Sequence, residues 1–209
     1  MSELANTNAG RLRELARQRG SLDEDFGQTL WDGATDRAGT ARRGMMFLIL
    51  TLSSMFLLLS SASWIRMNAA DWVSPTLPWQ LWLSTALLLA CSALLELGRR
   101  RLRAGQGGRP LLIASAGLAM AFLFSQYWAW GLMNELGYFL AANPANSFFY
   151  LMTGLHALHV LAGLLVFGKV LLGLSETPSG DELGLQLCAW YWHFLLAIWL
   201  VLFAVLSAS

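Results

Sequence analysis

Charged residues are scarce in this sequence. They make up 13% of its 209 residues, about half of the roughly 25% found in soluble globular domains. Of the 14 Lys and Arg and the 13 Asp and Glu, 14 lie in the first 43 residues, so the rest of the chain carries too few charges to cover a surface that faces water. The formal net charge of +1 gives no reason to expect nucleic acid as a partner. A soluble enzyme is therefore disfavoured, and lipid is the expected solvent.

Other absences remove further classes of protein. The two cysteines, Cys91 and Cys188, stand singly, which excludes a disulfide framework and a CxxC redox pair. No nucleophile lies beside a general base, and Gly105, Gly107 and Gly108 form a basic turn rather than a phosphate-binding loop between a strand and a helix. No internal repeat is present.

Five long apolar stretches account for most of the chain. A helix needs about 20 apolar residues to cross a bilayer, and charge-free runs of that length predict five transmembrane helices, near 44–65, 77–98, 110–132, 147–172 and 184–207. The predicted fold class is all-α, an integral membrane bundle. We expect residues 44–209 to form this transmembrane domain, and residues 1–43 a separate polar segment, in which 10–19 forms either a short basic helix or part of a solvated tail.

The distribution of cations predicts the orientation in the membrane. With five spans and a cytoplasmic N-terminus, 13 of the 14 Lys and Arg fall on the cytoplasmic side, and only Arg66 lies outside. Cationic loops are retained in the cytoplasm. The sequence therefore predicts a cytoplasmic N-terminal segment and a C-terminus on the outer side.

Ionisable residues are nearly absent from the predicted spans. Glu96 lies near the inner end of the second helix, and Arg99 and Arg100 follow it at the spacing of ion pairs on one helix face. We expect a local ion pair at that position. A proton pump or an ion-coupled transporter needs intramembrane carboxylates, so self-contained transport is disfavoured.

The three histidines are the main polar feature of the spans. His156 and His159 lie one turn apart on the fourth helix, and His193 lies at a similar depth on the fifth. Three imidazoles could ligate a metal, and one from each helix could ligate haem. No carboxylate or thiolate is placed to orient the rings. Hydrogen bonding to Ser, Thr, Trp or backbone groups across a helix interface is therefore the favoured interpretation, with the ligand alternative left open.

Small residues predict close helix packing. Gly117, Ala121 and Ser125 recur every four residues on the third helix, and Gly154 and Gly163 lie on the fourth. Such stripes let another helix approach closely. Physical chemistry alone therefore describes a five-helix membrane protein that binds other helices.

Two motifs resemble those of a known family. The run FYLMTGLHALHV at 149–160, followed by Gly163, closely resembles the T-G-x-H-x-x-H-V signature of subunit III of the haem-copper oxidases. The run WYWHF at 190–194, with Trp199 after it, is similar to that family's Y-W-H-F signature. Weaker matches in the second and third spans extend the resemblance over residues 44–207.

The resemblance implies a short, five-helix bacterial form of this subunit. Such a protein would be a non-catalytic, multi-pass component of the inner membrane that binds no haem or metal itself and retains phospholipid. Haem and copper would belong to the partner subunit I, within a complex that also contains subunit II. The implied role is assembly, stability, lipid retention and support of proton uptake in aerobic electron transport. We expect seven residues to form a buried polar cluster in the last three helices: His156, His159, His193, Thr153, Gln126, Tyr191 and Trp192.

Three acidic residues usual in the family are missing. The segment that begins at Gly44 reaches Leu52 and Ser53 without an acid, and Ala129 and Leu196 stand where the family has Glu and Asp. A direct role in proton collection at these positions is therefore in doubt. Two alternatives remain open, an accessory subunit of nitric oxide reductase and a stand-alone membrane haem protein with two histidine ligands.

Overall fold

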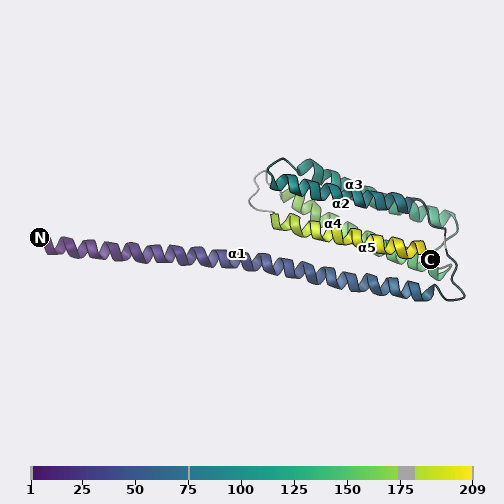
Figure 1. Ribbon diagram of the computed structural model, residues 1–209, viewed down its shortest axis with the longest axis horizontal. Helices are drawn as coiled ribbons and strands as arrows, with labels where there is room; N and C mark the ends of the chain where they lie inside the picture. Colours follow the sequence, from purple (N-terminus) through teal and green to yellow (C-terminus); the bar gives the residue numbers. More distant parts are fainter. Residues whose placement is uncertain (1, 75, 174–181, 209) are drawn as a thin grey trace. The chain divides into compact units, whose positions relative to one another are not determined.

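The structure, a computed structural model, describes residues 2–74, 76–173 and 182–208. All secondary structure in these residues is helical, in five elements (Figure 1): α1 Ser2–Arg66, α2 Gln80–Arg103, α3 Arg109–Glu135, α4 Pro144–Gly173 and α5 Glu182–Ala208. Each helix contains a segment long and apolar enough to cross a membrane, which in α1 is Arg37–Arg66. The prediction of an all-α fold with five candidate spans is confirmed.

The first helix begins much earlier than the sequence suggested. Instead of a short helix at 10–19 or a tail, α1 is helical from Ser2 onward. Proline is absent before Pro75, so no residue forces a break in the backbone hydrogen bonding. The chain divides into two compact units, Met1–Gly44 and Met45–Ser209, and the first is a polar extension of a helix whose second half is apolar.

The turn between α2 and α3 depends on glycine. Gly105 and Gly107 have φ of 69° and 61°, values that other residues rarely adopt. Gly98 and Gly108 lie at the adjoining helix ends, where a Cβ on Gly108 would collide with the carbonyl oxygen of Gly98. This close approach joins α2 and α3 in a tight antiparallel hairpin.

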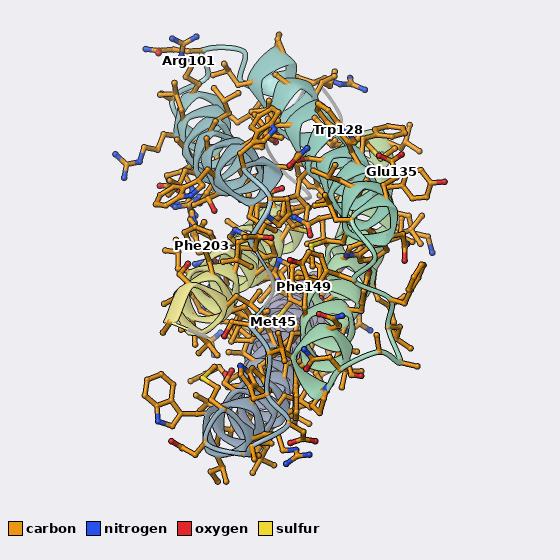
Figure 2. All side chains as sticks on the ribbon, turned by 90° about the vertical axis from the view of Figure 1, so that its right-hand side faces the viewer. Met45, Arg101, Trp128, Glu135, Phe149 and Phe203 are labelled. Carbon is orange, nitrogen blue, oxygen red and sulfur yellow. The ribbon has the colours of Figure 1, made fainter. Side chains whose placement is uncertain are left out.

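Helices α2 to α5 form the main bundle. Within it α2 packs on α3 and α5, and α4 packs on α3 and α5. Side chains from these helices fill the centre around Phe149, whereas Arg101 lies at the far end of α2 (Figure 2). Contacts between Trp82 and Phe203, with ring centroids 4.8 Å apart, help to fix the antiparallel register of α2 and α5.

The membrane half of α1 contributes little to the core. Phe56, with 1% of its surface exposed, packs on Met152, Ile198 and Leu202. Many of the other apolar side chains in this half point outward, for example Phe47, which is 70% exposed. Such a surface is unfavourable in water and suited to lipid or to other membrane helices.

Candidate functional site

Buried polar side chains link α2 and α3 through a directional chain of hydrogen bonds. The Nε2 of Gln126 donates to the Oγ of Ser84 at 2.8 Å, and Ser84 and Ser125 share a hydrogen bond at 3.0 Å. Ser125 in turn donates to the carbonyl oxygen of Gln80 at 3.3 Å. A carbonyl oxygen only accepts, and this fixes the direction of the chain. Gln126 donates to Ser84, Ser84 donates to Ser125, and Ser125 donates to the carbonyl oxygen of Gln80. This chain stabilises the α2–α3 interface in an apolar interior.

Two tryptophans connect the other helices through threonine. Trp199 of α5 donates from Nε1 to the Oγ1 of Thr85 on α2 at 2.9 Å, and Trp130 of α3 donates to the Oγ1 of Thr153 on α4 at 3.0 Å. Each threonine hydroxyl donates to a carbonyl of its own helix one turn back. The indole donors are thus satisfied without water, which matters because an unpaired donor in hydrocarbon is costly.

His156 lies among aromatic rings in the centre of the bundle. Its side chain is fully buried, with ring centroids 5.1 Å from Trp199, 5.7 Å from Phe122 and 6.3 Å from Phe56. Neither ring nitrogen has a hydrogen-bond partner among the described residues. The residue therefore joins α1, α3, α4 and α5 by packing rather than by a hydrogen bond.

His159 is held by its own helix and by α5. Its Nδ1 donates to the carbonyl oxygen of Leu155 at 2.7 Å. The hydroxyl of Tyr191 donates to the carbonyl oxygen of His159 at 3.1 Å. The Tyr191 ring also covers Gly163, where an added Cβ would lie 2.6 Å from Cε1 of the ring. Glycine at this position therefore permits the close contact of α4 with α5.

His193 lies on a different side of α5 from Trp199, the α5 residue that contacts His156 of α4. Its Nδ1 and the Oγ of Ser92 on α2 share a hydrogen bond at 2.6 Å, and its Nε2 is 3.9 Å from Oε2 of Glu96. Glu96 accepts from Arg99 at 2.8 Å and from Arg100 at 2.8 Å. The predicted local ion pairs of Glu96 are confirmed, and His193 makes the kind of interhelical hydrogen bond that was favoured.

The seven residues expected to cluster lie in several separate environments, and the three histidines are each in a different one. His156 contacts aromatic rings, His159 and Tyr191 meet at the α4–α5 interface, and His193 faces α2. Gln126 bonds toward α2, and Thr153 bonds to Trp130. Trp192 is buried with its ring centroid 6.1 Å from Phe167, and its Nε1 has no partner within the part of the chain described.

Residues outside the predicted cluster complete these contacts. Thr85, Ser84 and Trp130 carry hydrogen bonds that hold the bundle together. A signal for them was present in the sequence, since hydroxyl residues within apolar spans need a partner. Which indole or amide meets which hydroxyl depends on the helix register, which the sequence does not give.

The small residues singled out for packing differ in their surroundings. Gly163 is in tight contact with Tyr191, and Gly154 faces Trp130 at 3.7 Å from its ideal Cβ position. Ala121 is half-buried and Ser125 is buried, whereas a Cβ on Gly117 would meet nothing within 4 Å. The part of the stripe at Gly117 thus faces away from the other helices of this chain, and a contact with a helix of another protein stays a prediction.

Metal ligation was the alternative interpretation of the histidines. In residues 2–74, 76–173 and 182–208, no group of three or more His, Cys, Asp or Glu is placed to hold a metal ion. The rings of His156 and His193 contact different helices and do not face one another. The geometry therefore favours packing and hydrogen bonding as the use of these side chains.

Comparison with known proteins identifies relatives of the chain. A family model described as cytochrome c oxidase subunit III matches residues 45–208. Cytochrome c oxidase subunit 3 of Prototheca wickerhamii is 29% identical over 129 residues, which cover 60% of this chain and 49% of that protein. The subunit of the same name from Corynebacterium diphtheriae is 37% identical over 89 residues, 41% of this chain and 43% of that protein.

The matched region coincides with the apolar part of the molecule. The chain spans about half the length of the curated relatives it matches. The family match begins at Met45, where the second compact unit begins, and ends at the last residue of α5. It includes both histidine motifs and every helix of the main bundle. The chain therefore belongs to the cytochrome c oxidase subunit III family.

Proposed function

We propose that this chain is subunit III of a bacterial respiratory haem-copper oxidase of the cytochrome c oxidase type, with no catalytic centre of its own. The observation that carries the proposal is the family match over residues 45–208. The relative from Corynebacterium diphtheriae supports a bacterial cell membrane as its location. Haem and copper are assigned to the partner subunit I, in a complex that also contains subunit II.

The internal contacts support a role in assembly and stability. The polar side chains inside the bundle tie helices to one another, as in the Trp199–Thr85 and Trp130–Thr153 pairs, and the fully buried His156 ring is enclosed by aromatic rings. The outer surface is rich in apolar side chains, among them Leu172 at 84% exposed and Leu58 at 71%. This surface is suited to phospholipid and to the helices of larger subunits.

This chain has few acidic side chains within its spans with which it could take up protons itself. Two of the positions where the family has an acid carry Ala129, which is fully buried, and Leu196, which packs against the core. Glu96 is already engaged by two arginines. We therefore assign any effect of this chain on proton uptake to the way it supports the neighbouring subunit.

The orientation is part of the same proposal. The arginines at the end of α2, at the start of α3 and before the apolar half of α1 favour a cytoplasmic N-terminus and an outer C-terminus. Reporter fusions test this directly. We expect a cytoplasmic fluorescent reporter to be active at the N-terminus and in the turn at 104–107, and a periplasmic or extracellular phosphatase to be active after Ser209. The reverse pattern would contradict the orientation.

Deletion of the gene, followed by isolation of the oxidase under mild detergent, tests the functional proposal. We expect a lower yield of the haem-bearing complex and faster loss of activity during turnover, with an unchanged haem spectrum in the complex that remains. Complementation with the His156→Ala variant is expected to restore the yield only in part, because the aromatic packing around that ring is lost.

Two results would redirect the assignment. A Soret band in the purified single chain would favour a stand-alone haem protein. Co-purification with the large subunit of a nitric oxide reductase, and with no oxidase, would favour an accessory role in that enzyme. Identification of the co-purified haem-bearing partner by mass spectrometry decides between these outcomes.

A further inference from the structure

The connection between α2 and α3 carries a dense cluster of positive charge. Within residues 99–109, called here the arginine turn, five arginines stand at positions 99, 100, 101, 103 and 109. The only acid between residues 72 and 134 is Glu96, which already pairs with Arg99 and Arg100. Arg101 and Arg109 are exposed, and neither has an ion-pair or hydrogen-bond partner among the described residues. The turn therefore holds positive charge that the described part of the chain does not neutralise.

The arginine turn lies at the depth of the lipid headgroups. Arg99 comes 19 residues after Gln80, the first residue of α2, which corresponds to about 28 Å at a rise of about 1.5 Å per residue. The hydrocarbon core of a bilayer is about 30 Å thick. A helix that crosses this core from Gln80 therefore brings the guanidinium groups to the layer that contains the lipid phosphates.

An exposed apolar side chain lies one helical turn deeper than each unpartnered arginine. Leu97, which is 43% exposed, precedes Arg101 by four residues on α2. Ile113, which is 57% exposed, follows Arg109 by four residues on α3. Residues four apart lie on the same face of a helix. Each of these two faces thus has a cation at the level of the headgroups and an apolar surface beneath it, which matches the polarity of a phospholipid.

We propose that the arginine turn binds the headgroup phosphate of an anionic phospholipid, whose acyl chains lie against the faces that carry Leu97 and Ile113. Guanidinium groups bind phosphate oxygens through pairs of parallel hydrogen bonds. Basic clusters that directly follow a transmembrane helix attract anionic lipids. The inference rests on the lipid retention and the cytoplasmic side assigned to the turn in the proposed function, and it adds the location of the lipid and the sign of its charge.

The surroundings of the turn favour an anionic lipid over other ligands. The ammonium group of a zwitterionic headgroup is best paired with a carboxylate, and Glu96 is already engaged by two arginines. A protein partner would need apolar or aromatic side chains to bury, yet no large exposed hydrophobic residue lies between Leu97 and Ile113. Charge at headgroup depth is thus the main feature that the turn offers to a ligand.

Native mass spectrometry of the full chain in detergent tests the proposal. The probes are phosphatidylglycerol, which is anionic, and phosphatidylcholine, which is zwitterionic. We expect the wild type to bind phosphatidylglycerol more tightly. The Arg101→Gln/Arg109→Gln variant is expected to bind it about 25-fold more weakly, because each basic residue near an anionic lipid surface contributes about 1 kcal/mol, or about fivefold in affinity. Its affinity for phosphatidylcholine should stay the same.

Matched variants separate a specific site from a general effect of charge. Arg42→Gln/Arg43→Gln removes the same charge before the apolar half of α1, and we expect it to bind phosphatidylglycerol nearly as the wild type does. Arg101→Lys/Arg109→Lys keeps the charge but loses the paired hydrogen bonds, so its affinity should be intermediate. The tryptophan fluorescence spectrum of each variant reports whether the bundle has kept its fold. Glycerol 3-phosphate at the same concentration as the lipid, with a phosphate but no acyl chain, should not displace it.

Four results would overturn the proposal. They are equal affinity of the wild type for the two lipids, unchanged affinity in a folded Arg101→Gln/Arg109→Gln variant, equal weakening by the two glutamine variants, and displacement of the lipid by glycerol 3-phosphate. The measurement uses the single chain, so assignment of the chain to a different enzyme would leave the result unchanged. Conversely, loss of the lipid site alone would not change which haem-bearing partner co-purifies with the chain.

Discussion

The contact between Gly163 and Tyr191 gives the sharpest test of how α4 and α5 pack. An added Cβ at Gly163 would lie 2.6 Å from Cε1 and 3.1 Å from Cδ1 of the ring, whereas ordinary contacts lie at 3.4–4 Å. The ring cannot easily turn aside, because its hydroxyl is bonded to the carbonyl oxygen of His159. Gly163→Ala must therefore either displace the ring and break this hydrogen bond or push the two helices apart.

The magnitude follows from two opposing effects. Replacing glycine by alanine inside a helix stabilises it by up to about 1 kcal/mol. Overpacking of a well-packed interior costs about 1–3 kcal/mol. Gly117→Ala is the matched control, because a Cβ there meets nothing within 4 Å. We expect Gly163→Ala to be less stable than Gly117→Ala by about 1–3 kcal/mol, the steric cost alone.

Reversible unfolding in mixed micelles with increasing SDS, followed by fluorescence of the ten tryptophans, measures this difference. A second comparison uses Tyr191→Leu, which removes the ring atoms that a Cβ at position 163 would meet. In that background we expect Gly163→Ala to change the free energy of unfolding very little. Equal stability of Gly163→Ala and Gly117→Ala, or no relief by Tyr191→Leu, would refute the reasoning.

Two further predictions concern the interior hydrogen bonds and the turn. Thr85→Val leaves the indole N–H of Trp199 without its partner, and we expect a loss between about 0.6 kcal/mol, the mean for membrane hydrogen bonds, and about 3 kcal/mol for a buried unpaired donor. Thr85→Ser keeps the hydroxyl and should retain most of the stability in the same unfolding assay; equal loss from both variants would argue against the hydrogen bond. Gly108→Ala forces a Cβ against the backbone oxygen of Gly98, so we expect a marked drop in folded protein recovered from membranes, measured by size-exclusion chromatography. Gly131→Ala, which meets nothing within 4 Å, is the control, and recovery of Gly108→Ala at the control level would contradict the close approach.

A few hydrogen bonds between polar side chains select how the apolar helices of the bundle pair with one another. In lipid, apolar contact alone does not favour one helix pairing over another, because lipid tails are as apolar as leucine. The bonds of Trp199 with Thr85, Trp130 with Thr153 and Gln126 with Ser84 have specific geometry and therefore select a register. This accounts for how so few polar side chains can specify the arrangement of four long helices.

Several features were predictable from individual residues. The charge-free runs gave five candidate spans, and the spacing of Glu96, Arg99 and Arg100 gave the ion pairs that the structure contains. The motifs around His156 and His193 identified the family that the match over residues 45–208 shows. These features depend on local composition or on short spacing within one helix, so no knowledge of the tertiary contacts was needed.

The sequence by itself thus determined the solvent, the number of spans and the family, because the hydrophobic length of a span and the residues of a motif are written along one segment. Tertiary structure alone decided that the three histidines separate. His156 is enclosed by rings from three other helices, the backbone carbonyl of His159 accepts from Tyr191, and His193 hydrogen-bonds to Ser92 of α2. The physical reason is rotational: each helix can turn about its axis without changing its own sequence pattern, and only packing against its neighbours fixes which side chains meet.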